Sequence, residues 1–428
     1  MARAARSTSG KTGGPMSKTV VIVGAGIVGV STAIWLQRAG HAVTLIDRKG
    51  PGEGTSHGNG GVLASAALVP VPTPGLWKRA PRMLLDPHEP LFLKWGYLPR
   101  LLPWLTRYMG EATAEGVAKR ARAILPIIGD SLNDHIALSK GTGAERFVVP
   151  SDYLYVYDTH KDYLADGATW QVKRDAGFDC EVMDGPAFHA YDPSFGPAYQ
   201  CAVRQKDHGR ISDPGAYVKA LAAHVETEGG RILRGDVTDI ARENGRVTGV
   251  RVSGEHLACD AVVLAAGAWS AGLARQLGVT VPMESERGYH LELWEPSVMP
   301  RAPVMIASGK FVATPMDGRL RLAGIVEFGG LDAPASKAPF ALLENNIRKA
   351  IPGITWKRRV EWMGHRPSMS DSLPMIGAVP GAQGAFAGFG HDHVGLTGGP
   401  KTGRLLAQLI SGTTPNIDLA PYSPSRFR

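Results

Sequence analysis

A glycine-rich turn near the start of the chain limits the fold most strongly. Residues 19–23 are apolar and rich in β-branched side chains, as in a buried parallel strand, and GAGIVG follows at residues 24–29. A helix is predicted over residues 27–39, and a second strand over residues 42–46 ends at Asp47. This order predicts a βαβ unit that binds a dinucleotide, with the pyrophosphate at the helix N-terminus and Asp47 on a ribose. A turn that binds no ligand is the alternative.

Chain length, hydropathy and charge indicate how many domains to expect and whether a membrane span or a nucleic-acid partner is expected. The 428 residues exceed what one hydrophobic core usually serves, so we expect two domains. No run of eighteen apolar residues occurs, which predicts no transmembrane helix. The net charge of +8 comes without a basic stripe interleaved with aromatic residues, so nucleic acid is not expected as a partner.

The first residues and the cysteines bear on the compartment. Residues 1–16 lack an apolar core and are interpreted as a disordered extension, not a secretory signal. The three cysteines, Cys180, Cys201 and Cys259, lack the spacing of a disulfide framework or a zinc site. They fit a reducing compartment, which predicts a cytoplasmic protein with no structural metal.

Strand patterns dominate the middle of the chain. The Asn244-Gly245 pair between two short apolar runs of residues 232–252 predicts a β-hairpin. Residues 261–265 form a buried strand pattern, and residues 396–410 predict the last long helix. Further strands, which fit an antiparallel sheet, are predicted at residues 153–157, 287–293 and 319–325.

The segment from Leu76 to Gly110 is rich in Pro, Leu and aromatic residues. Helices that pack in a second domain are one interpretation. A patch that lies on a membrane surface is the other.

Three further elements favour FAD over NAD as the dinucleotide. The loop GTSHGNGG at residues 54–61 offers hydroxyl groups to a pyrophosphate and small residues to a flat ring, although a plain linker is the alternative. The strand at residues 261–267 ends in small residues. The run at residues 388–400 enters the last helix, whose N-terminus would stabilise an anionic reduced flavin.

Arg366 is the first candidate for substrate binding, because a guanidinium group presents a planar fork suited to a carboxylate. Pro367 follows it and favours an extended turn, and a structural salt bridge is the alternative. Tyr289 would bond the substrate or pack in the core. The histidines His57, His391 and His393 are candidates for flavin or substrate contact, or else structural residues.

In this order, GAGIVG, GTSHGNGG, VVLAAGAW and the tail WMGHRPSMSDSLPMIG…GFGHDHVGLTGGPKTG resemble the D-amino-acid oxidase and dehydrogenase superfamily, which includes glycine and sarcosine oxidases. The resemblance runs from about Lys18 to the C-terminus. The chain looks closest to bacterial D-amino-acid dehydrogenases. The stretches RPSMSDSLP and APYSPSRF look like members that act on D-hydroxyproline or related imino acids.

The resemblance implies roles for individual residues. Arg366 is implied as the clamp on the substrate carboxylate, with Tyr289 and His57 as further catalytic candidates. No cysteine lies in the tail, so the FAD is expected to be non-covalent. We expect FAD contacts from Gly24, Gly26, Ile27, Val28, Gly29, Asp47, Arg48, Thr55, Ser56, Asn59, Gly60, Gly61, Val62, Val237, Ala266, Gly267, Trp269, His391, His393, Val394, Gly395, Leu396 and Thr397.

The expected fold class is α/β, with a Rossmann-like FAD-binding domain interleaved with a substrate domain that has a mixed or antiparallel sheet. The FAD-binding domain is expected at residues 17–75, 195–285 and 361–428, and the substrate domain at residues 76–194 and 286–360.

The expected function is dehydrogenation of a small D-amino acid or cyclic imino acid, of D-proline or hydroxy-D-proline type, by hydride transfer to flavin. A quinone or carrier protein is the expected acceptor, with peripheral contact to the inner membrane. The alternatives are a glycine- or sarcosine-type amine oxidase that uses O₂, and a non-catalytic flavin-binding assembly protein.

Overall fold

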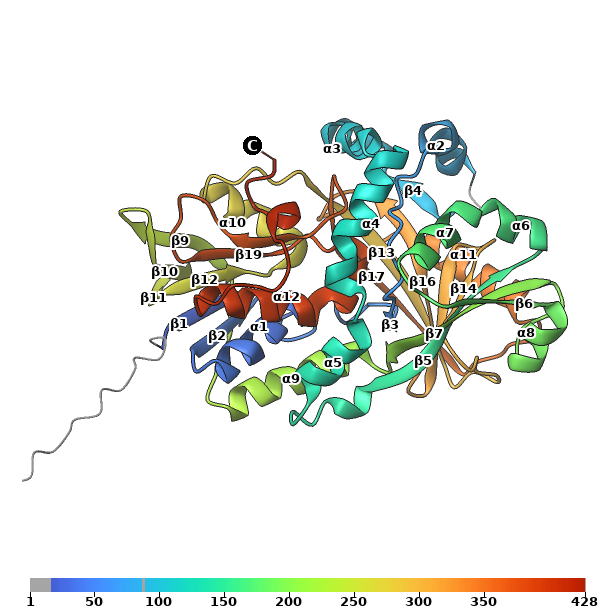
Figure 1. The fold of residues 1–428 in the computed structure, drawn as a ribbon, viewed down its shortest axis with the longest axis horizontal. Coiled ribbons are helices and arrows are strands. Elements are labelled where there is room, and N and C mark those ends of the chain that lie inside the picture. The colour runs from blue at the N-terminus through green and yellow to red at the C-terminus, as the bar shows by residue number, and fades with distance from the viewer. Residues whose placement is uncertain (1–16, 87–88, 428) are drawn as a thin grey trace, which may run out of the picture.

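The computed structural model describes residues 17–86 and 89–427, so the expected extension at residues 1–16 lies outside the described residues. Figure 1 shows two lobes side by side, each built around one sheet. The strand order of the first, six-stranded sheet is β18-β19-β12-β1-β2-β8. Its strands are β1 (Thr19–Val23), β2 (Ala42–Asp47), β8 (Arg231–Arg234), β12 (Ala261–Leu264), β18 (Met375–Ala378) and β19 (Ala385–Phe389).

Helices cover one face of the six-stranded sheet and a small sheet covers the other. Val20 and Ile22 of β1 point into a core shared with α1 (Ile27–Arg38), α9 (Pro214–Thr227) and α12 (Gly395–Ile410). Val21 and Val23 face α10 (Ser270–Gln276) and a three-stranded sheet of β9 (Val237–Glu243), β10 (Arg246–Val252) and β11 (Glu255–Ala258). Every residue of β1 after the first is buried, as its apolar run predicts.

The hairpin predicted at Asn244-Gly245 is confirmed. Both residues have positive φ, 50° and 78°, as the two central positions of a type I′ turn require. The turn places Arg246 opposite Glu243 and pairs β9 with β10 antiparallel.

The second sheet has ten strands and forms the other lobe (Figure 1). Its path is β17-β13-β16-β15-β14-β5-β7-β3, with β4 paired to β16 and β6 to β7. Its strands are β3 (Val62–Leu63), β4 (Leu91–Leu93), β5 (Val148–Tyr157), β6 (Cys180–Asp184), β7 (Cys201–Ile211), β13 (Met283–Trp294), β14 (Val304–Ile306), β15 (Phe311–Met316), β16 (Arg319–Phe328) and β17 (Arg358–Met369). The mixed α/β class is confirmed, and the strands predicted around residues 153–157, 287–293 and 319–325 are present.

Sheet membership departs from the expected domain boundaries. Strands β3, β7 and most of β17 belong to the ten-stranded sheet, although they fall inside the ranges expected for FAD binding. Conversely, α4 (Ala114–Ile128) and α5 (Ser131–Ser139) pack against α12 in the core beneath the six-stranded sheet. An apolar pattern shows that a segment is buried but not which sheet it covers, so the two sheets divide the chain differently from the expected ranges.

The remaining helices lie around the ten-stranded sheet. They are α2 (Leu76–Leu85), α3 (Leu98–Gly110), α6 (His160–Ala165), α7 (Gly167–Asp175), α8 (Gly185–Tyr191) and α11 (Ala338–Ala350). The aromatic segment at residues 76–110 does form helices with a core of their own, in which Trp104 and Tyr108 of α3 pack on Phe328 of β16. Among the described helices, none is both long and apolar enough to span a bilayer.

A candidate FAD and substrate cavity

A cavity of about 730 Å³ runs between the two sheets. The glycine-rich turn after β1 lines one end of it, and Arg366 of β17 lines the other. Every residue expected to contact FAD lines this cavity except Gly29 and Gly61. Residues as far apart in the sequence as Val23 and Thr397 are therefore brought to one site.

The glycines of the first turn are required by close contacts. Gly24 has φ +109°, and a Cβ there would lie 2.4 Å from the carbonyl oxygen of Ala265. A Cβ on Gly29 would lie 1.9 Å from the carbonyl oxygen of Gly24, so Gly29 closes the turn without facing the cavity. Gly26 is different, because its Cβ would meet only the Ser56 hydroxyl at 3.2 Å. Its missing side chain leaves room at the start of α1.

Two side chains hold this turn against its neighbours. The Asp47 carboxylate accepts hydrogen bonds from the amides of Ala25 (3.0 Å), Lys49 (2.9 Å) and Gly50 (3.0 Å). The Ser56 hydroxyl accepts one from the amide of Ile27 at 3.0 Å. Both side chains line the cavity. The loop and the helix N-terminus therefore present amides and an acid to the same end, which suits the pyrophosphate and ribose of FAD.

Strand β9 and the loop after β12 line a further part of the cavity. Val237, at the start of β9, is buried and lines the cavity. The guanidinium carbon of Arg48 lies 4.5 Å from the centroid of the Trp269 ring, a cation–π contact that also borders the cavity. None of the described residues that line the cavity is a cysteine. The three cysteines have no disulfide partner.

Arg366 stands at the other end, half-buried, on a strand and not in the turn that the sequence suggested. Its guanidinium group crosses Gly288 of the neighbouring strand, where a Cβ would lie 2.7 Å from the arginine Cζ. Glu286 lies directly opposite Arg366 in the antiparallel register of β13 and β17. Gly288 therefore leaves the space in which the guanidinium group turns toward the cavity.

Two buried carboxyl groups accompany Arg366, and sequence reasoning missed both. Burial and the nearby Asp392 raise the pKa of Glu286 to about 8, although Arg366 and a hydrogen bond from Ser368 oppose the shift. Asp392 is 4% exposed, has φ +53°, and its carboxylate oxygens have no hydrogen-bond partner among the described residues. Burial opposes its ionisation, but His393, Arg120 and Arg366 lower the pKa of Asp392 overall. This end of the cavity is thus strongly polar.

Tyr289 does not hold the position expected of a substrate contact. Its hydroxyl donates to Glu327 at 2.6 Å and accepts from the amide of Ser336 at 2.9 Å. Its ring is 1% exposed in the core of the ten-stranded sheet. Arg287 is equally enclosed, in an ion pair with Glu327 at 2.9 Å. Tyr289 also lines the cavity, but its paired hydroxyl group and buried ring fit the core-packing alternative.

His57 also departs from its expected role, since it does not line the cavity. Its ring packs behind the loop, with centroids 6.0 Å from Trp362 and 6.4 Å from His290. By contrast His391 and His393 do line the cavity. His391 is buried against the hydroxyl of Thr402 at 2.9 Å, and burial lowers its pKa to about 4. No group of His, Cys, Asp or Glu in residues 17–86 and 89–427 is arranged to hold a metal ion.

Comparison with known proteins agrees with this geometry. The family model described as FAD dependent oxidoreductase (DAO) matches residues 19–409. A protein of Bradyrhizobium diazoefficiens named D-amino-acid oxidase is 37% identical over 96% of this chain and 100% of its own length. A D-amino acid dehydrogenase of Rhizobium rhizogenes is 30% identical over 95% of this chain and 99% of its own length.

Among solved structures, glycine oxidase from Geobacillus kaustophilus superposes with a TM-score of 0.74 at 22% identity, covering 96% of this chain and 99% of that one. L-proline dehydrogenase from P. horikoshii gives a TM-score of 0.73 at 17% identity, covering 96% and 98%. These two similarities bear on the fold alone. With the family match over residues 19–409, they support one conclusion: the chain belongs to the DAO family of FAD-dependent oxidoreductases.

Proposed function

We propose that this protein oxidises the carbon–nitrogen bond of a small D-amino acid or cyclic imino acid, of the D-proline or hydroxy-D-proline type. The observation that carries the proposal is one cavity that joins the FAD-binding turn to a half-buried arginine, Arg366. The names of the relatives, D-amino-acid oxidase and D-amino acid dehydrogenase, favour the D series.

The protein's contribution to the reaction is placement and electrostatics. Arg366 binds the substrate carboxylate as a bidentate partner and so orients Cα toward the flavin end of the cavity. Bound FAD supplies the acceptor for the hydride that leaves Cα. The buried walls limit water, so the amine and the carboxylate meet fixed groups instead of solvent. The oxidation product of a cyclic substrate would leave as a cyclic imine. The imine formed from an open-chain substrate would be hydrolysed by water after its release.

Anaerobic bleaching of the bound flavin tests the substrate class. The purified protein is mixed, without oxygen, with a panel of D- and L-amino acids that includes both prolines, hydroxy-D-proline, glycine and sarcosine. Bleaching is expected with D-forms, and fastest with the cyclic ones. Bleaching by glycine and sarcosine alone would favour the amine-oxidase alternative. A flavin that no compound bleaches would favour the non-catalytic assembly protein.

Steady-state kinetics of Arg366→Ala and Arg366→Lys test the carboxylate clamp. We expect kcat/KM to fall at least about a hundredfold for alanine, equivalent to about 2.7 kcal/mol, with lysine only partly restoring it. Arg358→Ala is the matched control, because Arg358 lies on the same strand but is exposed and outside the cavity. Normal kinetics in Arg366→Ala would place the clamp elsewhere.

For the electron acceptor we propose a quinone or a carrier protein, in line with the dehydrogenase relatives. Because another relative is named an oxidase, electron transfer to O₂ is the alternative that an experiment must distinguish. Peroxide formation in air is expected to be much slower than reduction of an artificial dye. Equal rates of peroxide formation and dye reduction would instead assign O₂ as the electron acceptor.

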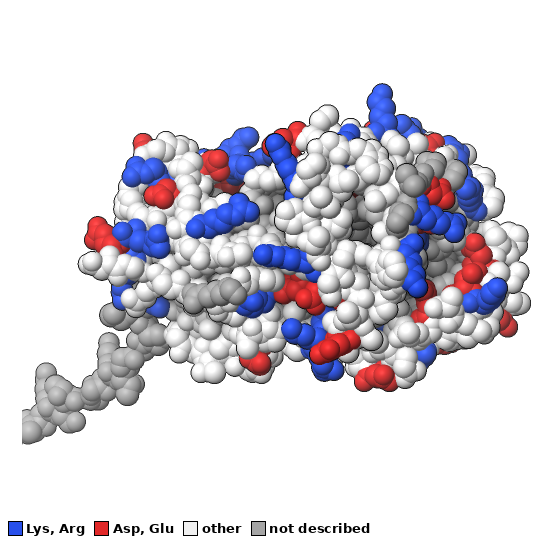
Figure 2. All heavy atoms as spheres, turned by 90° about the horizontal axis from the view of Figure 1, so that it is seen from above, with Lys and Arg blue, Asp and Glu red and all other residues white. Residues whose placement is uncertain are grey.

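For location we propose a cytoplasmic protein whose α2 and α3 side touches the inner membrane. Trp77 (65% exposed), Trp95 (57%) and Leu102 (46%) stand on this side with the exposed basic residues Lys78 and Arg82. Figure 2, which views the molecule from above, shows Lys and Arg side chains around uncharged surface on this face. Aromatic and basic groups together suit an anionic lipid surface.

Flotation with phosphatidylglycerol-containing vesicles tests this contact. The double variant Trp77→Ser/Trp95→Ser should lose most of the binding. Leu164→Ser is the control, since Leu164 is 61% exposed but belongs to α6 and not to α2 or α3. Wild-type protein that floats equally with neutral vesicles, or with none, would contradict the proposal.

A further inference from the structure

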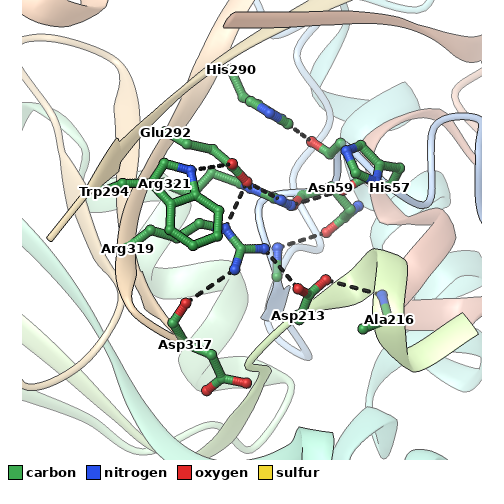
Figure 3. A network of polar contacts seen from close by, with 12 residues as sticks. His57, Asn59, Asp213, Ala216, His290, Glu292, Trp294, Asp317, Arg319 and Arg321 are labelled. Carbon is green, nitrogen blue, oxygen red and sulfur yellow. Dashed lines mark hydrogen bonds and ion pairs between the residues drawn. The ribbon is translucent and has the colours of Figure 1, made fainter. Parts of the chain in front are cut away.

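Three successive carbonyl groups of the loop at residues 57–59 are held by side chains of the ten-stranded sheet. Arg321 of β16 donates through Nη1 to the carbonyl oxygens of His57 at 2.9 Å and Asn59 at 2.6 Å. Nδ1 of His290, on β13, lies 3.0 Å from the carbonyl oxygen between them, that of Gly58. Figure 3 shows these contacts converging on the loop from one side.

Arg321 is itself fixed by a buried ion cluster. It is 0% exposed and donates through Nη2 (2.5 Å) and Nε (3.1 Å) to Oε1 of Glu292. Burial disfavours the Glu292 carboxylate, but Arg321 and Arg319 lower its pKa to about 2, so it is ionised at neutral pH. The guanidinium group therefore has one orientation, and its remaining donor group points at the loop.

His290 is neutral, because burial and the charge of Arg321 lower its pKa to about 3. Its contact with a carbonyl oxygen then requires the proton on Nδ1. Trp362 stacks on the His290 ring, with centroids 5.0 Å apart and planes at 18°. A Cβ on Gly58 would lie 1.8 Å from the ring of this tryptophan, so the loop backbone packs directly on the Trp362 ring.

These contacts determine where the loop amides point. In a trans peptide the carbonyl and the N–H group point in opposite directions. With the carbonyls of His57 and Asn59 directed at the sheet, the amides of Gly58 and Gly60 are directed toward the cavity, which both glycines line. The amide of Asn59 instead donates to the carbonyl oxygen of Ser56 at 3.4 Å. Within the described chain, the amides of Gly58 and Gly60 donate to no protein acceptor. They are free to donate to a bound ring.

We propose that Arg321 is a positioning residue that, with His290, turns these amides toward the flavin ring and so raises its reduction potential. Amide donors favour the form of the ring that carries more negative charge, which is the reduced one. The inference rests on FAD binding and not on the identity of the substrate.

The test compares Arg321→Met with Arg319→Met in the holoprotein. Arg319 lies on the same strand, is 4% exposed, and donates to the same Glu292 at 2.8 Å, but it reaches Asp213 and Asp317 instead of the loop. The two variants therefore remove the same group from one ion cluster. The flavin potential is measured by xanthine oxidase reduction with a reference dye, and FAD affinity by titration of the apoprotein.

Both variants should lower the melting temperature of the apoprotein by similar amounts. Only Arg321→Met should lower the two-electron potential, by at least a tenfold shift in the reduction equilibrium, or about 30 mV, and weaken FAD binding at least tenfold. Equal potentials in the two methionine variants would show a purely structural ion cluster and overturn the proposal.

Arg321→Lys keeps the test open if Arg321→Met does not fold. A lysine has no planar fork and cannot reach both carbonyl groups while it holds Glu292. The flavin potential of Arg321→Lys should therefore lie below that of the wild type and, where Arg321→Met folds, above that of Arg321→Met. A wild-type potential in Arg321→Lys would also overturn the proposal. Because the reduction uses no amino acid, failure of the proposed substrate would leave this measurement unaffected.

Discussion

Single residues at the cavity are constrained by what lies within a few ångströms of them. A Cβ at Gly24 or Gly29 would collide with backbone, so these positions serve the fold. A Cβ on Gly26 would meet only the Ser56 hydroxyl, at 3.2 Å, and Gly26 lines the cavity, so its lack of a side chain serves the ligand. The carboxylate of Asp47 serves both, because it holds three amides and also faces the cavity.

Substitutions at Gly26 and Asp47 are expected to weaken FAD binding by different routes. Gly26→Val places a branched side chain where the pyrophosphate approaches and should nearly abolish binding. Asp47→Ala removes charged hydrogen bonds and should cost about 1.5–3 kcal/mol of binding free energy. FAD titration of each apoprotein measures both effects. Wild-type flavin content in Gly26→Val would show that this turn is not the phosphate cradle.

The buried Glu286 predicts a pH dependence for the clamp. Its pKa is raised to about 8, so it is neutral below pH 8, and of the two buried carboxyl groups only Asp392 then opposes the charge of Arg366. Above pH 8 the new Glu286 anion competes with a ligand carboxylate for Arg366. Asp392 faces the same carboxyl group, and its pKa is lowered, so it stays ionised throughout.

Propanoate, which has no amine to titrate, is a suitable probe of this effect. Its affinity, read from the flavin spectrum, should fall about fivefold between pH 8 and pH 9 in the wild type. Glu286→Gln should bind propanoate without this fall. A flat wild-type profile would contradict the assignment.

Sequence reasoning succeeded where a residue's role follows from its immediate neighbours. The turn at Gly24–Gly29, the acid at Asp47 and the hairpin at Asn244-Gly245 all obey local rules. It could not decide a role that depends on which way a side chain points across a sheet, as for Tyr289, where substrate contact and core packing both stayed open. The Arg319–Arg321 pair carried a signal that was overlooked, since charged residues alternating within an otherwise apolar strand require buried partners.

At the level of secondary structure, α1 and α12 form the tightest helix contact at the cavity. A Cβ on Gly403 of α12 would lie 2.6 Å from backbone atoms of Ser31 and Thr32 in α1. One turn earlier, a Cβ on Gly399 would lie 2.9 Å from Ile27. Both helices begin at the cavity, so their spacing sets the distance between the pyrophosphate turn and Gly395–Thr397.

Gly403→Ala is therefore expected to destabilise the fold by at least about 1–3 kcal/mol through overpacking, and to weaken FAD binding as α12 shifts. The control is Gly167→Ala in α7, where a Cβ meets nothing within 4 Å. There the alanine should be neutral or stabilising. Urea unfolding with FAD titration measures both quantities. Equal stability of the two variants would show that the helix contact is looser than described.

On the scale of the whole molecule, the two sheets meet only through segments that alternate along the chain. The cavity between them draws on β1, β9, β13, β17 and the start of α12. No element-by-element pattern in the sequence marks this junction, and β3, β7 and most of β17 join the ten-stranded sheet although their ranges were expected for FAD binding. A ligand that fills the junction stabilises both lobes at once.

The bound FAD should therefore leave with unfolding and not before it. Trichloroacetic acid is expected to release all flavin into the supernatant, because none of the described cavity-lining residues is a cysteine. FAD at a hundred times its dissociation constant should add about 2.7 kcal/mol to the free energy of unfolding. Flavin that stays with the precipitate would show a covalent link.

The arrangement of the cavity also sets an order of events during synthesis. Its walls come from Val23 at one extreme and Thr397 at the other, and β19 joins β12 only after every strand of the ten-stranded sheet has been made. Helix α12 follows the last strand of either sheet along the chain, so Gly395–Thr397 are the last part of the cavity wall to be synthesised. Until α12 has been made, the cavity lacks this wall. Flavin capture is thus expected only after α12 has been made, and in cells short of FAD the apoprotein should be more open to proteases.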